Sequence, residues 1–555
     1  MKINIKKVLL GLSLTTVIGA CTKLEQKNYN QFDQGVFYNN QNEVISAVLR
    51  PYTHTNAWAT STDHRSWWKV SELSADQLAW PQKGVDGYDG GVWIRLHHHD
   101  WSSDDEIARN PWALMYVGIG YCNTAIENIS RREATAMGIT EEDKSQYLAE
   151  LKLLRAMYYM RTMDMYGNIP YVTSTTEVHP KTMPRAQVYD SIETSIKENI
   201  NLVPILSDAN KGRISRAAGY AILAELYLNG EVWSGKPRWQ DCVAACDSLI
   251  LNKEGNVTGT MQLDSTVTQT YSPNNNRSQE QIFSILYNYQ TAAWVPGWPG
   301  NFYHFRQNIV YGGNRTGNNG IVAIPGVYGS YDNDDKRKKE WFFIGPMWGY
   351  LASTGQDNAD HNNPMLGIRE YNGKQIVFVD AIKKFSTLPA NATSADSAKL
   401  VSDMENGEEN SGVRINKWRL GASTNARYNS TSWVVYRLTW IYFAKAEALM
   451  RLNGGSATPE AVDLVNAVRK RAFDPSLWTS KLYTTGTLTM DSLLAERGRE
   501  FITEGYRRQD LIRFNKFVTT SWWDHTASGD KNKELFAVPL TQLGLNSNLE
   551  QNPGY

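Results

Sequence analysis

The chain is poor in cysteine, with four among its 555 residues. Small secreted domains that rely on disulfides carry many closely spaced cysteines, so the sequence excludes a framework of that kind. Cys242 and Cys246 lie four positions apart on a predicted helix, where buried thiols usually act as small hydrophobic groups. We favour that structural role over a metal site.

The chain also lacks net charge, because 57 Lys and Arg residues balance 57 Asp and Glu residues. Proteins that bind nucleic acid, or that hold another polyanion electrostatically, need a basic surface. Neither kind of partner is therefore expected, and the charge balance favours a neutral ligand.

The apolar run at the N-terminus, residues 8–20, is too short for a transmembrane helix, which needs about 20 residues. It follows Lys2, Lys6 and Lys7 and ends in small residues, which is the pattern of an export signal. The sequence therefore predicts a signal peptide over residues 1–20. Removal of these lysines leaves the mature chain slightly acidic.

Cys21 directly follows Gly19 and Ala20, and this ending resembles the lipobox of bacterial lipoproteins. In such proteins the cysteine is lipidated and becomes the mature N-terminus. Several acyl chains together give stable anchoring, since each buried methylene contributes about 0.8 kcal/mol. We expect lipidation at Cys21 and a flexible tether over residues 21–34, with an ordinary secretory signal and a coincidental cysteine as the alternative.

Helical periodicity occurs in blocks with recognisable ends. One block runs over residues 148–165 and stops before Gly167, a typical terminator. Ser215 and Thr458 are predicted N-caps, and Pro459 stands at the first helical position after Thr458. The predicted helices lie around residues 148–165, 216–226, 239–250, 438–449 and 459–472.

These helices are expected to pair. Antiparallel helices with small residues between them resemble tetratricopeptide-type units. Residues 255–430 show weaker periodicity and many Gly, Asn and Trp residues, with short strand-like runs at 281–287 and 375–379. We therefore predict a mainly α fold, in which a helical-pair scaffold over about 35–254 and 431–555 carries a loop-rich ligand-binding insertion over about 255–430. Loops on a rigid scaffold are where binding residues usually lie.

Several motifs carry a resemblance to a known family. The strongest is the run from Leu494 to Phe514, which contains LAERGREF and EGYRRQDLIRF. Others are AELKLLRA at 149–156 before YGNIP at 166–170, GRIS at 212–215 before AELYL at 224–228, and QNPGY at 551–555. Together they are similar to the SusD/RagB family of outer-membrane glycan-binding lipoproteins, over nearly the whole mature chain, residues 35–555.

The resemblance implies a SusD-like helical fold and a function in capture. It implies a cell-surface lipoprotein that faces the cell exterior, binds polysaccharide or oligosaccharide, and delivers it to a SusC-like TonB-dependent transporter. It implies neither a catalytic site nor a cofactor nor a metal.

Two polar segments could suggest other chemistry. The run from Glu496 to Arg513 is predicted as a helix with ion pairs at i,i+4 spacing, such as Glu504 with Arg508. Its acids could be catalytic, but we favour an ion-pair network that fixes the C-terminal segment onto the scaffold. The three consecutive histidines at 97–99 are predicted to form a polar loop, because three adjacent residues rarely share one metal ion.

Tryptophans in polar loops carry the functional prediction. Trp80 follows SELSAD at 71–76, which resembles the family's entry to a ligand-contacting loop. The resemblance implies a stacking ring near Trp80 and a sugar-hydroxyl contact near Arg65, and Trp67 is a further candidate. Trp294 and Trp298 lie in the Gly/Pro-rich segment AWVPGWPG at 293–300.

These tryptophans suggest a binding surface for a neutral sugar chain. Apolar sugar faces pack on aromatic rings, and planar polar side chains reach the hydroxyls. We therefore expect Trp80, Trp294 and Trp298 to form an exposed aromatic surface. Where some family members offer another tryptophan, this chain has Ile321, so the third ring is open between Trp341 and Trp348.

A surface glycoside hydrolase acting on the same glycans is the alternative function. Such an enzyme uses two carboxylates about 5–10 Å apart. With 57 acidic residues, the sequence leaves room for such a pair. It contains no hydrolase, nucleophile-elbow or zincin motif, and we therefore favour binding without catalysis.

Overall fold

The computed structural model describes residues 37–62, 65–252, 255, 257–258, 261–287, 298–313, 316–419 and 431–555. Cys21, the predicted tether and Trp294 lie outside these residues. Within them the chain is mainly helical, with a few short strands in two-stranded sheets, which confirms the predicted fold class. None of the described helices is both long enough and apolar enough to cross a membrane.

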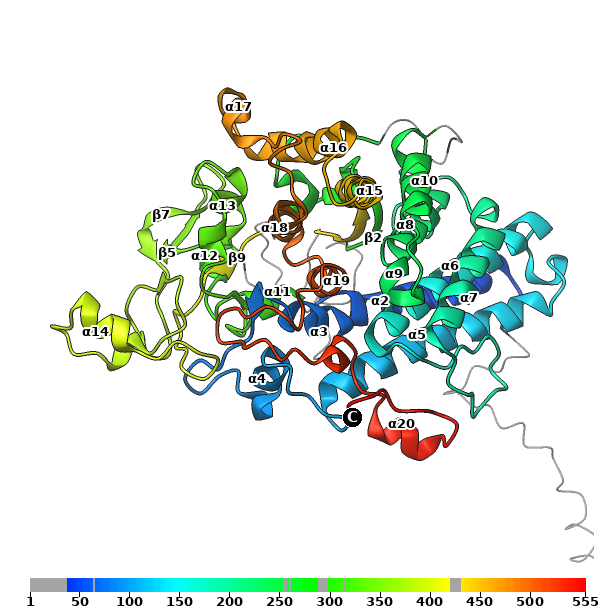
Figure 1. The fold of residues 1–555 in the computed structure, drawn as a ribbon, viewed down its shortest axis with the longest axis horizontal. Coiled ribbons are helices and arrows are strands. Elements are labelled where there is room, and N and C mark those ends of the chain that lie inside the picture. The colour runs from blue at the N-terminus through cyan, green and yellow to red at the C-terminus, as the bar shows by residue number, and fades with distance from the viewer. Residues whose placement is uncertain are drawn as a thin grey trace, which may run out of the picture.

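Four long helices pack in chain order in the first part of the scaffold (Figure 1). They are α2 (Gln41–Ala59), α5 (Glu106–Ser130), α6 (Glu141–Tyr166) and α7 (Arg185–Asn199). Each contacts the next along the chain. α6 stops before Gly167 as predicted, because Gly167 adopts a φ of 67° that residues with a Cβ rarely tolerate.

A second helical group joins segments that are far apart in the chain. Its members are α8 (Arg216–Leu228), α10 (Trp239–Ile250), α15 (Leu438–Leu452) and α16 (Pro459–Arg469). α10 contacts both α8 and α15, and α15 contacts α16. The hydroxyls of Ser215 and Thr458 accept hydrogen bonds from the backbone in the first turns of α8 and α16, so both predicted N-caps are confirmed.

The predicted helix from Glu496 to Arg513 is in fact two helices, α18 (Met490–Phe501) and α19 (Arg507–Arg513). Between them Thr503 and Gly505 have φ angles of 73° and 87°, which a right-handed helix cannot accommodate. Glu504 therefore lies outside any helix, and its predicted pairing with Arg508 is wrong. Glu504 instead accepts hydrogen bonds from Arg437 and Lys417, while Arg508 donates to Asp164.

The expected ion-pair network is confirmed, with different partners. Glu500 is buried and lies 2.8 Å from Arg337, 3.1 Å from Arg437 and 2.6 Å from Arg471. Burial alone would raise the pKa of Glu500, but Arg471, Arg437 and Arg337 lower it below its ordinary value. Arg437 also contacts Glu504 at 2.9 Å, so α18 and the segment after it are joined to distant parts of the chain.

The described strands are short and pair antiparallel. The predicted run at 281–287 contains β2 (Gln281–Ile285), which pairs with β10 (Trp433–Arg437). The run at 375–379 contains β8 (Val377–Phe378), which pairs with β5 (Gly345–Pro346). The longest strand, β7 (Gln356–Pro364), forms a hairpin with β6 (Trp348–Leu351).

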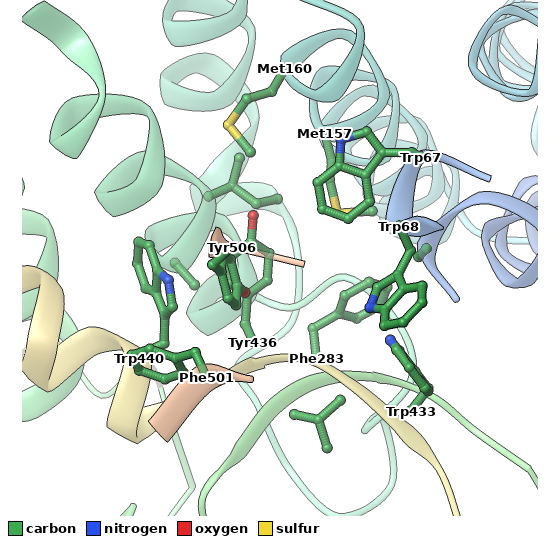
Figure 2. Packing of buried hydrophobic residues seen from close by; sticks show 14 of the residues in the cluster. Trp67, Trp68, Met157, Met160, Phe283, Trp433, Tyr436, Trp440, Phe501 and Tyr506 are labelled. Atoms are coloured by element: carbon green, nitrogen blue, oxygen red, sulfur yellow. The ribbon is translucent and has the colours of Figure 1, made fainter. Parts of the chain in front are cut away.

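The core is rich in aromatic rings that come from many elements. Figure 2 shows Trp67 and Trp68 of α3 (Trp67–Leu73) near Trp433 of β10 and the methionines of α6. The Trp68 indole donates a hydrogen bond to the carbonyl of Thr503 at 2.9 Å. This bond fixes the irregular segment between α18 and α19 against α3.

The three consecutive histidines do not form the predicted polar loop. His97 ends α4 (Val92–His97), and both His97 and His99 are buried while His98 is partly exposed. The His97 and His99 rings pack against His525 with centres 6.1 and 4.3 Å away. In the described part of the chain, no three His, Cys, Asp or Glu side chains are arranged to hold a metal ion.

Candidate ligand-binding site

Three of the predicted site tryptophans are buried. Trp67, Trp80 and Trp298 are 3%, 5% and 0% exposed, so the expectation of an exposed aromatic surface is wrong for Trp80 and Trp298, and Trp67 is equally covered. Trp294 lies outside the described residues. The reason is tertiary packing: other elements supply rings that enclose these indoles.

Trp298 and Trp67 belong to the aromatic core. The ring centre of Trp298 lies 5.9 Å from that of Trp418 and 5.3 Å from that of Trp433. Trp67 meets Trp58 edge to face at 5.7 Å. Both indoles therefore contribute to stability, and neither presents a face to solvent.

Trp80 is enclosed by a ring on one side and by glycine backbone around its edge. Its indole stacks on Trp93 of α4, with ring centres 5.2 Å apart and planes 9° apart. A Cβ added at Gly320 would lie 2.7 Å from the Trp80 ring, and one added at Gly87 would lie 3.0 Å from its Nε1. Only glycine allows the backbone to come this close, so the two glycines permit the burial of Trp80.

Arg65 lies next to this stack and reaches a cleft. Its guanidinium carbon is 4.9 Å from the Trp93 ring centre, a cation–π distance. Its Nε is 3.0 Å from Glu106 of α5, whose side chain is half exposed. Arg65 is itself only 4% exposed, and its predicted contact with sugar hydroxyls stays a prediction.

The cleft lies between α4 and the N-terminus of α5, and we call it the α4–α5 cleft. Its volume is about 420 Å³, within the usual range of small-molecule sites. Its walls are formed mainly by charged and small residues. They are Arg65, Asp89, Gly90, Val92, Arg95, Ser102, Asp104, Asp105 and Glu106.

Tyr88 provides an exposed aromatic ring beside this cleft. It is 51% exposed and precedes Asp89, which lines the cleft. A Cβ added at Gly91 would lie 3.7 Å from the Tyr88 ring and 3.3 Å from Arg95 Nη1, so the ring and the guanidinium flank the same glycine. The aromatic ring and the planar polar group that a sugar requires are therefore close together here.

Sequence reasoning missed Tyr88 because it considered tryptophan alone. The signal that could have identified it is the glycine-rich segment Gly84–Gly91, which begins four residues after Trp80 and carries one aromatic side chain. Glycine-rich connections expose the residues between them. Of the candidates for a third ring, Trp341 is buried and Trp348 stacks on His361, and neither lines the α4–α5 cleft.

Each carboxylate of the cleft has a hydrogen-bond or ion-pair partner. Asp105 contacts Arg95 at 2.8 Å, and Asp89 accepts a hydrogen bond from the Trp93 indole at 2.8 Å. A hydrogen bond from Ser102 lowers the pKa of Asp104. A general acid for glycoside cleavage needs a raised pKa instead, so Asp104 is unsuited to that role.

Two family profiles and a characterised relative match this sequence. The sequence profile described as "SusD family" matches residues 261–555, and one described as "Starch-binding associating with outer membrane" matches residues 24–228. The starch-binding protein SusD of Bacteroides thetaiotaomicron is 25% identical, over 89% of this chain and 86% of that protein.

Solved structures show the same fold. Surface glycan-binding protein A from Bacteroides thetaiotaomicron superposes with a TM-score of 0.68 at 19% identity, covering 93% of this chain and 100% of that one. A laminarin-binding SusD-like protein gives 0.67 at 19% identity, with coverage of 93% and 100%. Since the family profile covers more than half of the sequence, the chain belongs to the SusD family.

Proposed function

We propose that this protein captures neutral oligosaccharide or polysaccharide chains at the cell surface without cleaving them. The observation that carries the proposal is the exposed Tyr88 ring beside Arg95 and the ion-paired α4–α5 cleft. Relatives named for binding starch and laminarin support a glycan ligand. An anionic chain is disfavoured because Arg65 and Arg95 of the cleft are paired with Glu106 and Asp105, while Asp89 and Asp104 add negative charge.

Binding of a polysaccharide panel by affinity electrophoresis, followed by calorimetry with the best oligosaccharide, tests this proposal. Tyr88→Ala should weaken binding at least tenfold, which corresponds to about 1.4 kcal/mol. Tyr88→Phe is the matched control, because it keeps the ring and removes only the hydroxyl. Equal binding by Tyr88→Ala and the wild type would place the ligand elsewhere.

The same purified protein distinguishes binding from hydrolysis. Incubation with each polysaccharide that binds, followed by measurement of new reducing ends, should give no increase over a heat-inactivated sample. A steady release of reducing ends would instead favour the surface glycoside hydrolase.

We further propose that lipid on Cys21 anchors the protein to the outer membrane, where it delivers glycan to a SusC-like TonB-dependent transporter. A tethered binder cannot move a large ligand inward by itself, so it requires a transport partner. The family description that associates such proteins with the outer membrane supports this location. Affinity purification from detergent-solubilised membranes should recover a large β-barrel protein, and repeated recovery of the protein alone would count against delivery.

A further inference from the structure

The helix α13 (Lys336–Glu340) and β7 lie away from α4 and α5 (Figure 1). Residues of these two elements line a second cleft. We call it the α13–β7 cleft. Its volume is about 690 Å³, larger than that of the α4–α5 cleft, and the two have no lining residue in common. Its walls come from α13 and the segment before it, from β4 (Phe342–Phe343), from the start of β7, and from the segment that carries Asn416 and Arg419.

The first unusual feature of this cleft is Asp357. Its side chain is partly buried on β7 and has no hydrogen bond or ion pair with any residue that the structure describes. Burial raises the pKa of Asp357 to about 6, which the positive charge of Arg419 only partly offsets. A partly buried carboxylate without a protein partner is stabilised when a ligand or water donates a hydrogen bond to it.

The second feature is Arg419 on the same cleft. Its Nη2 is 2.6 Å from Glu340 Oε2, while its buried Nε has no hydrogen-bond partner among the described groups. The cleft therefore holds a partly exposed acceptor, on Asp357, and a partly exposed guanidinium, on Arg419, whose side-chain ion pair among the described residues is with Glu340. Both groups line the cleft, so a single ligand inside it can contact both.

The charges decide which class of ligand fits. A cation would be repelled by the positive charges of Lys338, Lys339 and Arg419. An anion would be repelled by the carboxylates of Asp357 and Glu340. A hydroxylated neutral ligand meets both requirements, because each hydroxyl can donate to Asp357 and accept from Arg419. Exposed Ile344 and partly exposed Tyr328 provide an apolar patch for a sugar face.

We propose that the α13–β7 cleft is a second binding site for a neutral oligosaccharide, in which Asp357 and Arg419 hold sugar hydroxyls. The inference rests on the proposed glycan-binding function and adds a second contact along the chain. Two sites on one rigid protein raise the avidity for a long polysaccharide without changing the affinity of either site for a short one.

Calorimetry with a short oligosaccharide, too short to reach both clefts, tests the proposal. The wild type should bind two equivalents, and Asp357→Ala should remove one of them or weaken it at least tenfold. Asp360→Ala is the matched control, since Asp360 lies on the same strand but does not line the cleft. Gln356→Trp is a second variant, which fills the cleft from its exposed rim and leaves Asp357 in place.

The outcomes separate this inference from the proposed function. If the wild type binds one equivalent that Tyr88→Ala abolishes and that neither Asp357→Ala nor Gln356→Trp alters, the second site is overturned and the first stands. If the wild type binds no oligosaccharide or polysaccharide of the panel, the glycan-binding function itself is overturned, and the second site with it. Loss of one equivalent in both cleft variants, at unchanged melting temperature, supports the second site.

Discussion

The indole of Trp80 lies parallel to the indole of Trp93, with their ring centres 5.2 Å apart. Lys69 Nζ is 5.2 Å from the Trp80 ring centre, and the Arg65 guanidinium is 4.9 Å from that of Trp93. The stack therefore packs against Arg65, which lines the α4–α5 cleft, and against Lys69. The stack packs Trp80 against α4, and the proposed contact with ligand falls to the exposed Tyr88.

Trp80→Ala should accordingly lower the stability of the protein. A buried aromatic side chain replaced by alanine costs about 3–5 kcal/mol in the free energy of unfolding, because it leaves a cavity. Chemical denaturation monitored by circular dichroism measures this loss. Tyr88→Ala is the comparison, and it should change the unfolding free energy by less than about 1 kcal/mol because the ring is exposed. Equal stability of Trp80→Ala and wild type would contradict the packed role.

Glu447→Gln should destabilise the contact between α15 and α19. Glu447 is buried and accepts hydrogen bonds from Arg513 at 2.6 and 2.7 Å and from Arg451 at 2.9 Å. Loss of one partner in a buried ion pair leaves an uncompensated charge, which costs about 3–5 kcal/mol. The control is Lys336→Ala at the exposed pair with Asp474, where about 0–1 kcal/mol is expected. Denaturant unfolding of both variants decides the matter, and similar losses would count against the network.

Acidification should weaken the packing of α4 on the segment around His525. Burial lowers the pKa of His97 to about 4, against an ordinary value of about 6.5 in the unfolded chain. As the pH falls from about 6.5 to about 4, His97 binds a proton in the unfolded chain but stays neutral in the folded protein. The free energy of unfolding therefore falls across this window. The loss from His97 alone is at most about 3 kcal/mol.

Other groups around His97 modify this pH response. Burial also lowers the pKa of His99 and of His525, so both act in the same direction as His97. His98 opposes them, because its hydrogen bond to Asp524 raises its pKa. Melting curves between pH 4 and 8 should show a decline below pH 6.5 that His97→Gln reduces and that His179→Gln, at an exposed position, leaves unchanged. A decline of the same size in all three proteins would exclude His97 as its source.

Cys21→Ala should release the protein from the membrane. Without the thiol no acyl chain can be attached, and the remaining chain should fractionate as a soluble protein. Thr22→Ala, which keeps the cysteine, should stay with the outer membrane. Membrane fractionation of cells that lack the transporter partner provides the measurement. Retention of Cys21→Ala in the membrane fraction of such cells would show that another feature anchors the protein.

Local sequence determined the helices and the class of fold. The C-terminal end of α6 and the N-terminal ends of α8, α10 and α16 agree with the prediction, because caps, glycines and apolar spacing act within a few residues. The start of α6 was predicted seven residues too late. The motif from Leu494 to Phe514 was sufficient to identify the family, although the break between α18 and α19 was missed. That break depends on a positive φ at Thr503, and a threonine does not predict such a backbone angle.

The candidate site depended on contacts between distant segments. Trp80 is buried because Gly320, more than two hundred residues later, brings its backbone against the ring, and Trp298 because Trp418 and Trp433 enclose it. Sequence alone names a tryptophan in a loop, but whether its face meets solvent or another ring depends on the whole fold. The sequence therefore determined what kind of protein this is, while only the tertiary structure decided which side chains a ligand can reach, because burial arises from packing between elements that no local pattern relates.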